Sequence, residues 1–112
     1  MKMPWAQQAY VPAPKITEYL LSPTHSKGRD KAKFFHRFGF QLEHWQVLAE
    51  ALRTHAQEYE WAYTQDTSFG TCNIIDGALA TPTGRQPMVR TVWIVETGTT
   101  TPRLVSAYPL PR

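Results

Sequence analysis

The chain has 112 residues, of which 42% are apolar and 19% charged, and it carries a net charge of +3. A chain of this length fits one hydrophobic core and is too short for two ordinary domains. Its composition excludes an intrinsically disordered protein, and the lack of any apolar run approaching about 20 residues excludes a transmembrane helix.

The first element expected is an extended N-terminal arm over residues 1–14, followed by a single α+β domain over residues 15–112. Proline fixes φ and removes a backbone donor, so a proline-rich segment does not form a regular helix. Three prolines interrupt the arm: Pro4, Pro12 and Pro14. The side chains expected to dock the arm are Trp5, Tyr10 and Val11.

Helical periodicity predicts a short helix and then a basic one. The short helix starts near Ile16 and ends before Pro23, because the residue before a proline disfavours the helical conformation. The second helix starts near Arg29 and ends before Gly39, which is expected in the left-handed conformation just past its end. The residues of this helix that are expected to face inward are Phe34, Phe35 and Phe38.

A third helix is predicted over roughly residues 43–57, because apolar residues recur there at helical spacing on one face. The members of this stripe are Trp45, Leu48, Ala49, Leu52 and Ala56. After this helix the pattern becomes alternating or continuously apolar, which is typical of strands.

Four strands are predicted, near residues 60–65, 71–79, 88–95 and 103–108. Short segments rich in turn-forming residues separate them. Connections this short favour antiparallel pairing between strands that are adjacent in sequence. The expected fold is therefore α+β, with N-terminal helices packed on a four-stranded antiparallel meander sheet.

Charge is unevenly distributed along the chain. Residues 43–66 are predominantly acidic, whereas residues 27–37 contain five cations against Asp30, namely Lys27, Arg29, Lys31, Lys33 and Arg37. A basic face built from the second helix and the last strands would attract phosphate groups. The alternative is a solvated surface that only keeps the protein soluble.

The sequence contains no metal-binding motif, phosphate-binding glycine loop, nucleophile elbow or dinucleotide fingerprint, so neither a metal nor a cofactor is expected. The groups present suit phosphodiester chemistry instead. His25 precedes the second helix and His36 lies on it, and imidazole can transfer protons near neutral pH. The alternative roles are structural: a hydrogen bond within its loop for His25, and a boundary position beside the phenylalanines for His36.

Candidate hydroxyl groups lie on the last two strands. Side chains alternate along a strand, so Thr91 is expected on one face of the sheet and Arg90 on the other. If a hairpin pairs Ile94 with Arg103, Thr91 lies directly opposite Ser106. Tyr108 would then follow two residues along the same face. Such a group can position a scissile phosphate, and the alternative is an ordinary cross-strand Thr–Ser pair.

Short sequence motifs are distributed over the part of the chain after the arm. They are Tyr19-Leu20-Leu21-Ser22-Pro23 through His25, Gly28-Arg29, Lys31-Ala32-Lys33-Phe34-Phe35, Gly39-Phe40, Thr81-Pro82, Gly84-Arg85, Val89-Arg90-Thr91-Val92-Trp93-Ile94 and Pro102-Arg103-Leu104-Val105-Ser106-Ala107-Tyr108-Pro109. In these motifs the chain resembles a bacterial domain family of unknown function. Members of that family stand beside small partner genes or at the C-termini of larger secreted proteins, a context typical of toxins.

The order of helices followed by four strands also resembles the barnase, colicin and RelE-like ribonuclease superfamily. Members of that superfamily cut RNA without a metal and use scattered His, Lys, Arg, Ser and Thr side chains. The resemblance implies a metal-independent ribonuclease or RNA-binding toxin of a bacterial conflict or toxin–antitoxin system. Its implied partners are RNA and a small acidic antitoxin or immunity protein, and a homodimer is also compatible with the sequence.

The residue roles in this hypothesis follow from side-chain chemistry. Proton transfer is assigned to His36 or His25. Phosphate binding is assigned to Lys31, Lys33, Arg29 and Arg90. Positioning of the phosphate is assigned to Thr91, Ser106 and Tyr108.

A second hypothesis of a different class is a non-catalytic interaction module, such as an antitoxin, an immunity protein or a virion accessory protein. Such a module needs only the Trp5 arm and an exposed strand edge. The expected location is the cytoplasm, because the single cysteine, Cys72, cannot form an internal disulfide and no signal-peptide pattern is visible. A toxin delivered by a larger carrier would share these features.

Overall fold

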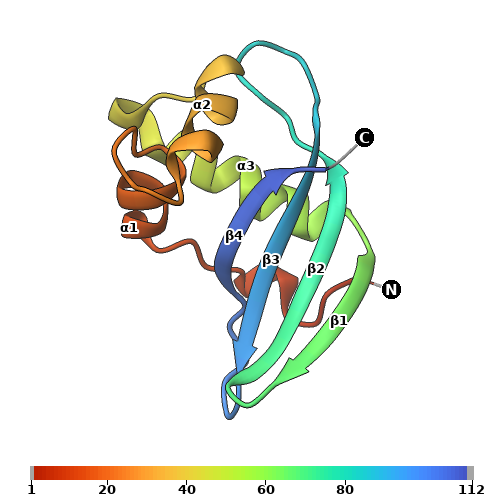
Figure 1. The fold of residues 1–112 in the computed structure, drawn as a ribbon. Coiled ribbons are helices and arrows are strands. Elements are labelled where there is room, and N and C mark those ends of the chain that lie inside the picture. The colour runs from red at the N-terminus through yellow and green to blue at the C-terminus, as the bar shows by residue number, and fades with distance from the viewer. Residues whose placement is uncertain (1, 111–112) are drawn as a thin grey trace.

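The computed structural model describes residues 2–110, so Met1, Pro111 and Arg112 lie outside the described residues. Helices come first and four antiparallel strands follow (Figure 1). The predicted α+β fold is therefore confirmed. Within the described range, no helix combines the length and the apolar character needed to cross a bilayer.

The helical segments occupy the first half of the chain. They are the 3-10 turn η1 (Ala6–Gln8), α1 (Ala13–Lys15), the π-type turn η2 (Ile16–Leu20), α2 (Arg29–Arg37), the 3-10 turn η3 (Leu42–His44) and α3 (Trp45–Glu58). The predicted short helix is the continuous segment formed by α1 and η2. Gly39 ends the turn after α2 with φ of 95°, as predicted, because glycine enters this conformation without a Cβ clash.

The strands are β1 (Trp61–Thr67), β2 (Gly70–Ala78), β3 (Met88–Glu96) and β4 (Arg103–Pro109). They lie side by side in sequence order, which confirms the predicted meander. The β1–β2 turn is tight because the Thr67 hydroxyl accepts hydrogen bonds from the backbone N–H groups of Phe69 and Gly70, both at 3.2 Å.

The N-terminal arm is only partly extended, because η1 and the start of α1 fall within residues 1–14. Val11 is buried as expected, whereas Trp5 and Tyr10 are 47% and 49% exposed. The arm is instead docked mainly by small or flexible apolar side chains, which also include Met3, Ala6 and Ala9. Its backbone is bound as well, since Arg53 of α3 donates a hydrogen bond of 2.9 Å to the carbonyl of Ala9.

The core lies between α3 and one face of the sheet, and α3 crosses behind the strands in Figure 1. The predicted stripe on α3 provides its buried residues Leu48, Ala49, Leu52 and Ala56. The sheet contributes Ile75, Val89, Trp93 and Leu104, each fully buried. Phe35 of α2 is fully buried too, while Phe34 and Phe38 are partly buried.

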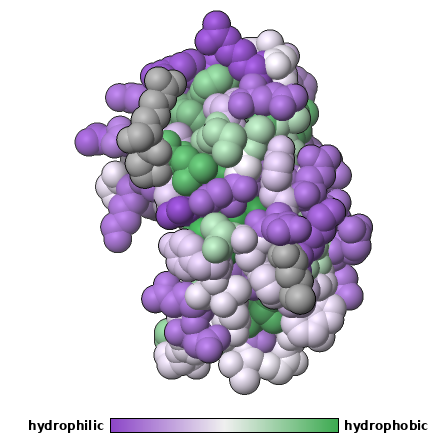
Figure 2. All heavy atoms as spheres, turned by 90° about the vertical axis from the view of Figure 1, so that its right-hand side faces the viewer, coloured by the Kyte–Doolittle hydropathy of each residue, from purple (hydrophilic) through white to green (hydrophobic). Residues whose placement is uncertain are grey.

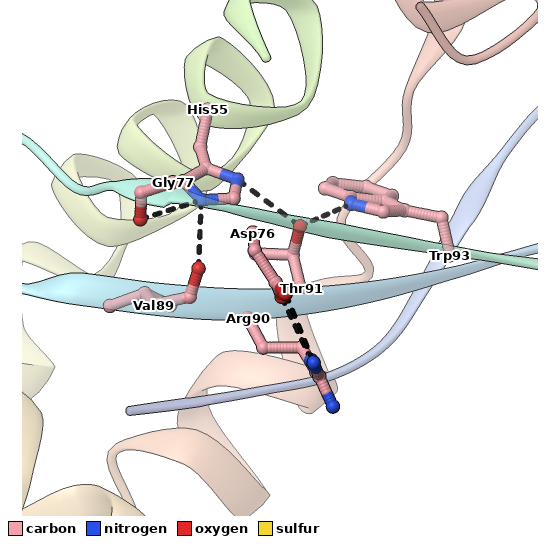
Figure 3. A network of polar contacts seen from close by, with 7 residues as sticks. All are labelled: His55, Asp76, Gly77, Val89, Arg90, Thr91 and Trp93. Carbon is pink, nitrogen blue, oxygen red and sulfur yellow. Dashed lines mark hydrogen bonds and ion pairs between the residues drawn. The ribbon is translucent and has the colours of Figure 1, made fainter. Parts of the chain in front are cut away.

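His55, also on α3, is buried within this apolar layer and links the helix to the sheet (Figure 3). Its Nε2 donates to the carbonyl oxygens of Gly77 at 3.2 Å and Val89 at 3.0 Å. Its Nδ1 accepts from the Thr91 hydroxyl at 3.2 Å, and the Trp93 indole N–H donates to Thr91 Oγ1 at 2.9 Å. A neutral imidazole with its proton on Nε2 satisfies every one of these bonds.

The β3–β4 register decides which side chains share a face. Ile94 pairs with Arg103, as predicted. A bulge in β4 then shifts the pairing by one residue, so Thr91 pairs with Ala107 and not with Ser106. The expectation that Thr91 and Ser106 lie opposite each other is therefore wrong, because one extra residue in a strand moves the residues after it to the other face.

Figure 2 shows the side of the molecule at which β1 lies. On the part of this face that the grey atoms do not cover, apolar residues form small groups separated by hydrophilic ones. Every residue of β1 after Trp61 is exposed. This edge of the sheet is therefore open to solvent along most of its length.

We predict that the stability of the protein depends on pH through His55. Burial lowers the pKa of His55, and the hydrogen bonds to Gly77 and Val89 oppose that effect only in part. Because the folded-state pKa lies below the ordinary value of 6.5, the unfolded chain takes up the proton first as the pH falls. The contribution of neutral His55 to the free energy of unfolding is therefore complete above pH 6.5, and it is lost as the pH falls below 6.5 and through the lower pKa of the folded state.

Urea unfolding from about pH 7 to about pH 5 measures this effect as a decrease in the free energy of unfolding. The His55→Gln protein should be less stable at neutral pH and should lose part of the pH dependence. The His44→Gln protein, altered at an exposed histidine, should retain the wild-type dependence. Equal pH dependence in all three proteins would contradict the prediction.

Candidate functional site

The face of the sheet turned away from α3, which we call the outer face, carries polar and aromatic side chains. Alternation along the paired strands places there Tyr63, Asp76, Arg90, Ser106 and Tyr108. Figure 3 shows the Arg90 side chain and the Thr91 hydroxyl on opposite sides of β3, with Asp76 bonded to Arg90. The prediction that Arg90 and Thr91 take opposite faces is therefore confirmed, and Thr91 does not share a face with Ser106 and Tyr108.

Arg90 is held by an ion pair in the middle of the outer face. Its Nε and Nη2 donate to the two carboxylate oxygens of Asp76 at 2.8 and 2.9 Å. The bonds to Asp76, together with one that the guanidinium donates to the Tyr108 hydroxyl oxygen, raise the pKa of Arg90 above its ordinary value, so the guanidinium stays charged. Its charge is balanced by Asp76, which leaves it poorly suited to bind a phosphate alone.

A second group of side chains, the tyrosine–lysine cluster, lies beside β4 and consists of Lys15, Tyr19, Lys31, Ser106 and Tyr108. The Tyr19 and Ser106 hydroxyl oxygens are 3.4 Å apart and share a hydrogen bond. The Lys31 ammonium lies 5.4 Å from the centre of the Tyr19 ring and 5.9 Å from that of Tyr108. The Lys15 ammonium lies 5.3 Å from the Tyr19 ring. Two lysine ammonium groups, two tyrosine rings and the Ser106 hydroxyl thus lie close together.

The Tyr19 hydroxyl ionises more easily than an ordinary phenol. Partial burial raises the pKa of Tyr19, but the Ser106 hydrogen bond and the proximity of Lys31 and Lys15 together lower it by more. The net effect is a pKa below the ordinary value of 10.0. The cluster therefore contains a phenol whose anionic form is stabilised by neighbouring cations.

Close packing against the loop before α2 fixes the position of Tyr19. A Cβ atom at Gly28 would collide with the Tyr19 carbonyl oxygen and lie 3.0 Å from its ring carbon Cδ1. The His25 ring meets the Tyr19 ring edge-on, with 5.1 Å between centres. His25 Nδ1 accepts from the backbone N–H groups of Lys27 and Gly28, each at 3.0 Å. A neutral His25 therefore carries its proton on Nε2.

Two shallow hollows flank the cluster. One, of about 380 Å³, is lined by Pro12, Pro14, Lys15, Tyr19, His25 and Arg103. The other, of about 390 Å³, is lined by Asp30, Lys31, Tyr108 and Pro109. A larger hollow of about 580 Å³ lies between the arm and α3, and its charged residues are Glu50 and Arg53, which form an ion pair. Each of the two hollows at the cluster has a lysine and a tyrosine in its lining, Lys15 and Tyr19 in one and Lys31 and Tyr108 in the other.

The structure brings together five of the predicted site residues: His25, Lys31, Arg90, Ser106 and Tyr108. Lys33 and Arg29 are exposed on α2. Since residues two apart on a helix project about 200° apart, Lys33 and Lys31 point to different sides of α2. The structure therefore separates Lys33 from the cluster.

The other two predicted residues are engaged in structural contacts. His36 bridges two turns, with Nδ1 at 2.8 Å from the carbonyl oxygen of Phe40 and Nε2 at 3.3 Å from that of Leu21. Thr91 is fully buried and bonded to His55. Thr91 therefore points into the core, away from Ser106, and both ring nitrogens of His36 face backbone carbonyl oxygens.

Sequence reasoning missed several residues of the outer face and its surroundings, namely Lys15, Tyr19, Tyr63, Asp76 and Arg103. Tyr19 follows Ile16 at the i, i+3 spacing of one apolar helix face, a pattern that indicates a core position and not a site residue. The spacing of Lys15 and Tyr19, four residues apart, is a signal for their contact, since such pairs meet on a helix surface. The approach of Tyr19 to Ser106 has no local signal, because 87 residues separate them.

Comparison with solved structures identifies a similar fold. The chain is similar to one from a contact-dependent growth inhibition toxin–immunity protein complex of Klebsiella pneumoniae 342, with a TM-score of 0.69 and 18% sequence identity. The match covers 89% of this chain and 98% of that chain. No curated protein matches. The sequence profile of the family described as "Domain of unknown function (DUF6883)" matches residues 2–111, and the chain therefore belongs to this family.

Proposed function

We propose that this protein is an RNA-cleaving toxin domain of a bacterial conflict system and that it acts at the tyrosine–lysine cluster. The proposal rests on the position of Lys31 between Tyr19 and Tyr108 and on the hydrogen bond between Ser106 and Tyr19. A cation beside several hydroxyl groups is suited to hold a phosphodiester and to stabilise the charge that develops on it. Similarity in fold to a chain of a toxin–immunity complex supports the proposal.

The proposed reaction is attack of a ribose 2′-oxygen on the adjacent phosphorus, with cleavage of the bond to the 5′-oxygen. The products are a 2′,3′-cyclic phosphate and a 5′-hydroxyl end. The ionised Tyr19 oxygen takes up the 2′-hydroxyl proton, and the leaving 5′-oxygen takes its proton from water. Lys31 stabilises the phosphoryl oxygens, while Ser106 and Tyr108 orient the phosphate.

His25 has a binding role in this proposal. Because its Nδ1 accepts two backbone hydrogen bonds, the ring presents Nε2–H as a donor. The hollow that it lines also contains Lys15 and Arg103, which suits a neighbouring phosphate of the RNA chain. His36, Lys33, Arg29 and Thr91 take no part.

The proposal includes a protein partner that neutralises the toxin. The cations around the cluster favour a partner that presents carboxylates to the same surface, because complementary charges accelerate and orient association. An acidic immunity protein or antitoxin would then block access of RNA to Lys31 and Tyr19. The similar chain from Klebsiella pneumoniae 342 comes from a complex of a toxin with its immunity protein.

The open edge of β1 favours a second candidate function, that of an interaction module. Among the described residues, β1 pairs in the sheet with β2 alone, and its residues after Trp61 are exposed. A partner strand could add to this edge through main-chain hydrogen bonds. A module of this kind would bind its partner without cleaving RNA.

The Lys31→Met protein should lose RNA cleavage by about 10²-fold or more, the usual scale for removing a group that stabilises developing charge. Lys33→Met is the matched control, with the same change on the other side of α2, and should stay within about twofold of wild type. Cleavage of labelled RNA in excess chelator, resolved on gels, measures both. Equal losses in the two variants would contradict the assigned site, and no cleavage by the wild-type protein would favour the interaction module.

The cleavage rate should rise with pH through the pKa of Tyr19, because its deprotonated oxygen is the proposed base. That pKa lies below 10.0. In the Lys31→Met protein the pKa of Tyr19 should rise, because the positive charge that stabilises the phenolate is removed. Ring-carbon NMR titration of labelled tyrosine gives the pKa, and a pH–rate profile gives the dependence of cleavage. A Tyr19→Phe protein with the wild-type profile would rule out Tyr19 as the base.

A further inference from the structure

Tyr63 on the edge strand β1 presents an exposed aromatic ring at the outer face. Its side chain is one of the exposed large hydrophobic groups, at 49%, and it diagonally neighbours Arg90 across β2. The Arg90 guanidinium carbon lies 5.5 Å from the centre of the Tyr63 ring. The ring and the guanidinium therefore form one continuous surface, and Tyr63 is about half exposed to solvent.

The Asp76 carboxylate fixes the orientation of the Arg90 guanidinium and neutralises its positive charge. The carboxylate binds the guanidinium through two nitrogens at 2.8 and 2.9 Å, which fixes the orientation of its plane. A guanidinium plane stacks on aromatic rings as well as on ligands. With the charge balanced by Asp76, the surface suits a flat, uncharged aromatic group better than a phosphate.

The same surface adjoins the tyrosine–lysine cluster. Tyr108 pairs with Arg90 across β3 and β4, and the Lys31 ammonium lies 5.9 Å from the Tyr108 ring. Directly paired residues on one face of a sheet have Cβ atoms only about 5 Å apart. A nucleotide whose base rests on Tyr63 and Arg90 can therefore place its phosphate beside Tyr108 and Lys31.

We infer that Tyr63 and the Arg90–Asp76 pair form a stacking site for an unpaired nucleobase, which makes single-stranded RNA the substrate class. The inference deepens the proposed function, on which it rests. Bases within a duplex stack on one another and offer no free face to a protein ring, whereas unpaired bases do. Stacking uses the π-face that every base has, so the site should show little preference among bases.

Binding of an RNA that cannot be cleaved tests the site separately from catalysis. The probe is a fluorescent single-stranded oligonucleotide with 2′-O-methyl groups throughout, and its affinity is measured by anisotropy. Tyr63→Ala should weaken binding roughly tenfold, within the range for loss of one base–aromatic stack. Tyr63→Phe keeps the ring and should bind like wild type. Phe69→Ala, which removes another exposed ring at the β1–β2 turn, should also bind like wild type.

The same oligonucleotide annealed to its complement should bind the wild-type protein more weakly than the single strand does. Wild-type affinity in a folded Tyr63→Ala protein, or equal affinity for duplex and single strand, would overturn the stacking site. If the wild-type protein fails to cleave ordinary RNA while the oligonucleotide results hold, the stacking site stands and the proposed cleavage falls. If cleavage proceeds in Tyr63→Ala with unchanged KM, the stacking site falls and the cleavage stands.

Discussion

The hydrogen bonds of His55 attach α3 to the face of the sheet that forms the core. A buried imidazole must satisfy both of its nitrogens, and this one does so on β2 and β3, through Gly77, Val89 and Thr91. The bonds fix the rotation of α3 about its axis and so direct its apolar stripe toward Trp93 and its neighbours. One face of the sheet is thereby filled, and alternation sends Arg90 and Asp76 to the other.

Two further structural features place polar groups on the outer face of the sheet. The bulge in β4 turns Ser106 and Tyr108 away from α3, where an unbroken register would have placed Ser106 opposite Thr91. The packing of η2 against Gly28 then holds the Tyr19 ring against that strand. A phenol with a lowered pKa, two lysines and a serine are assembled in this way from three separate segments, and the proposed function depends on that assembly.

Much of the fold follows from local patterns, because periodicity and turn chemistry act over short distances. The helical stripe of α3, the left-handed Gly39, the four strands and the opposite orientations of Thr91 and Arg90 all follow from them. The candidate site is harder to predict from local sequence patterns. A bulge has no reliable signal in sequence, and His55 on an acidic helix looked unremarkable because its partners lie 22 or more residues away. His36 lies on the basic helix but its nitrogens face carbonyls that only the folded chain brings near.

We propose that one face of the sheet is structural and attached to α3 through His55, and that the outer face binds RNA through Tyr19 and Lys31. Chemical-shift mapping with an uncleavable single-stranded RNA tests it most directly, because each face contains distinct probes. Shifts are expected at Tyr63, Lys31 and Ser106, with the Trp93 indole N–H signal unchanged. Shifts concentrated around Lys33 and His36, or in the hollow between the arm and α3, would contradict it.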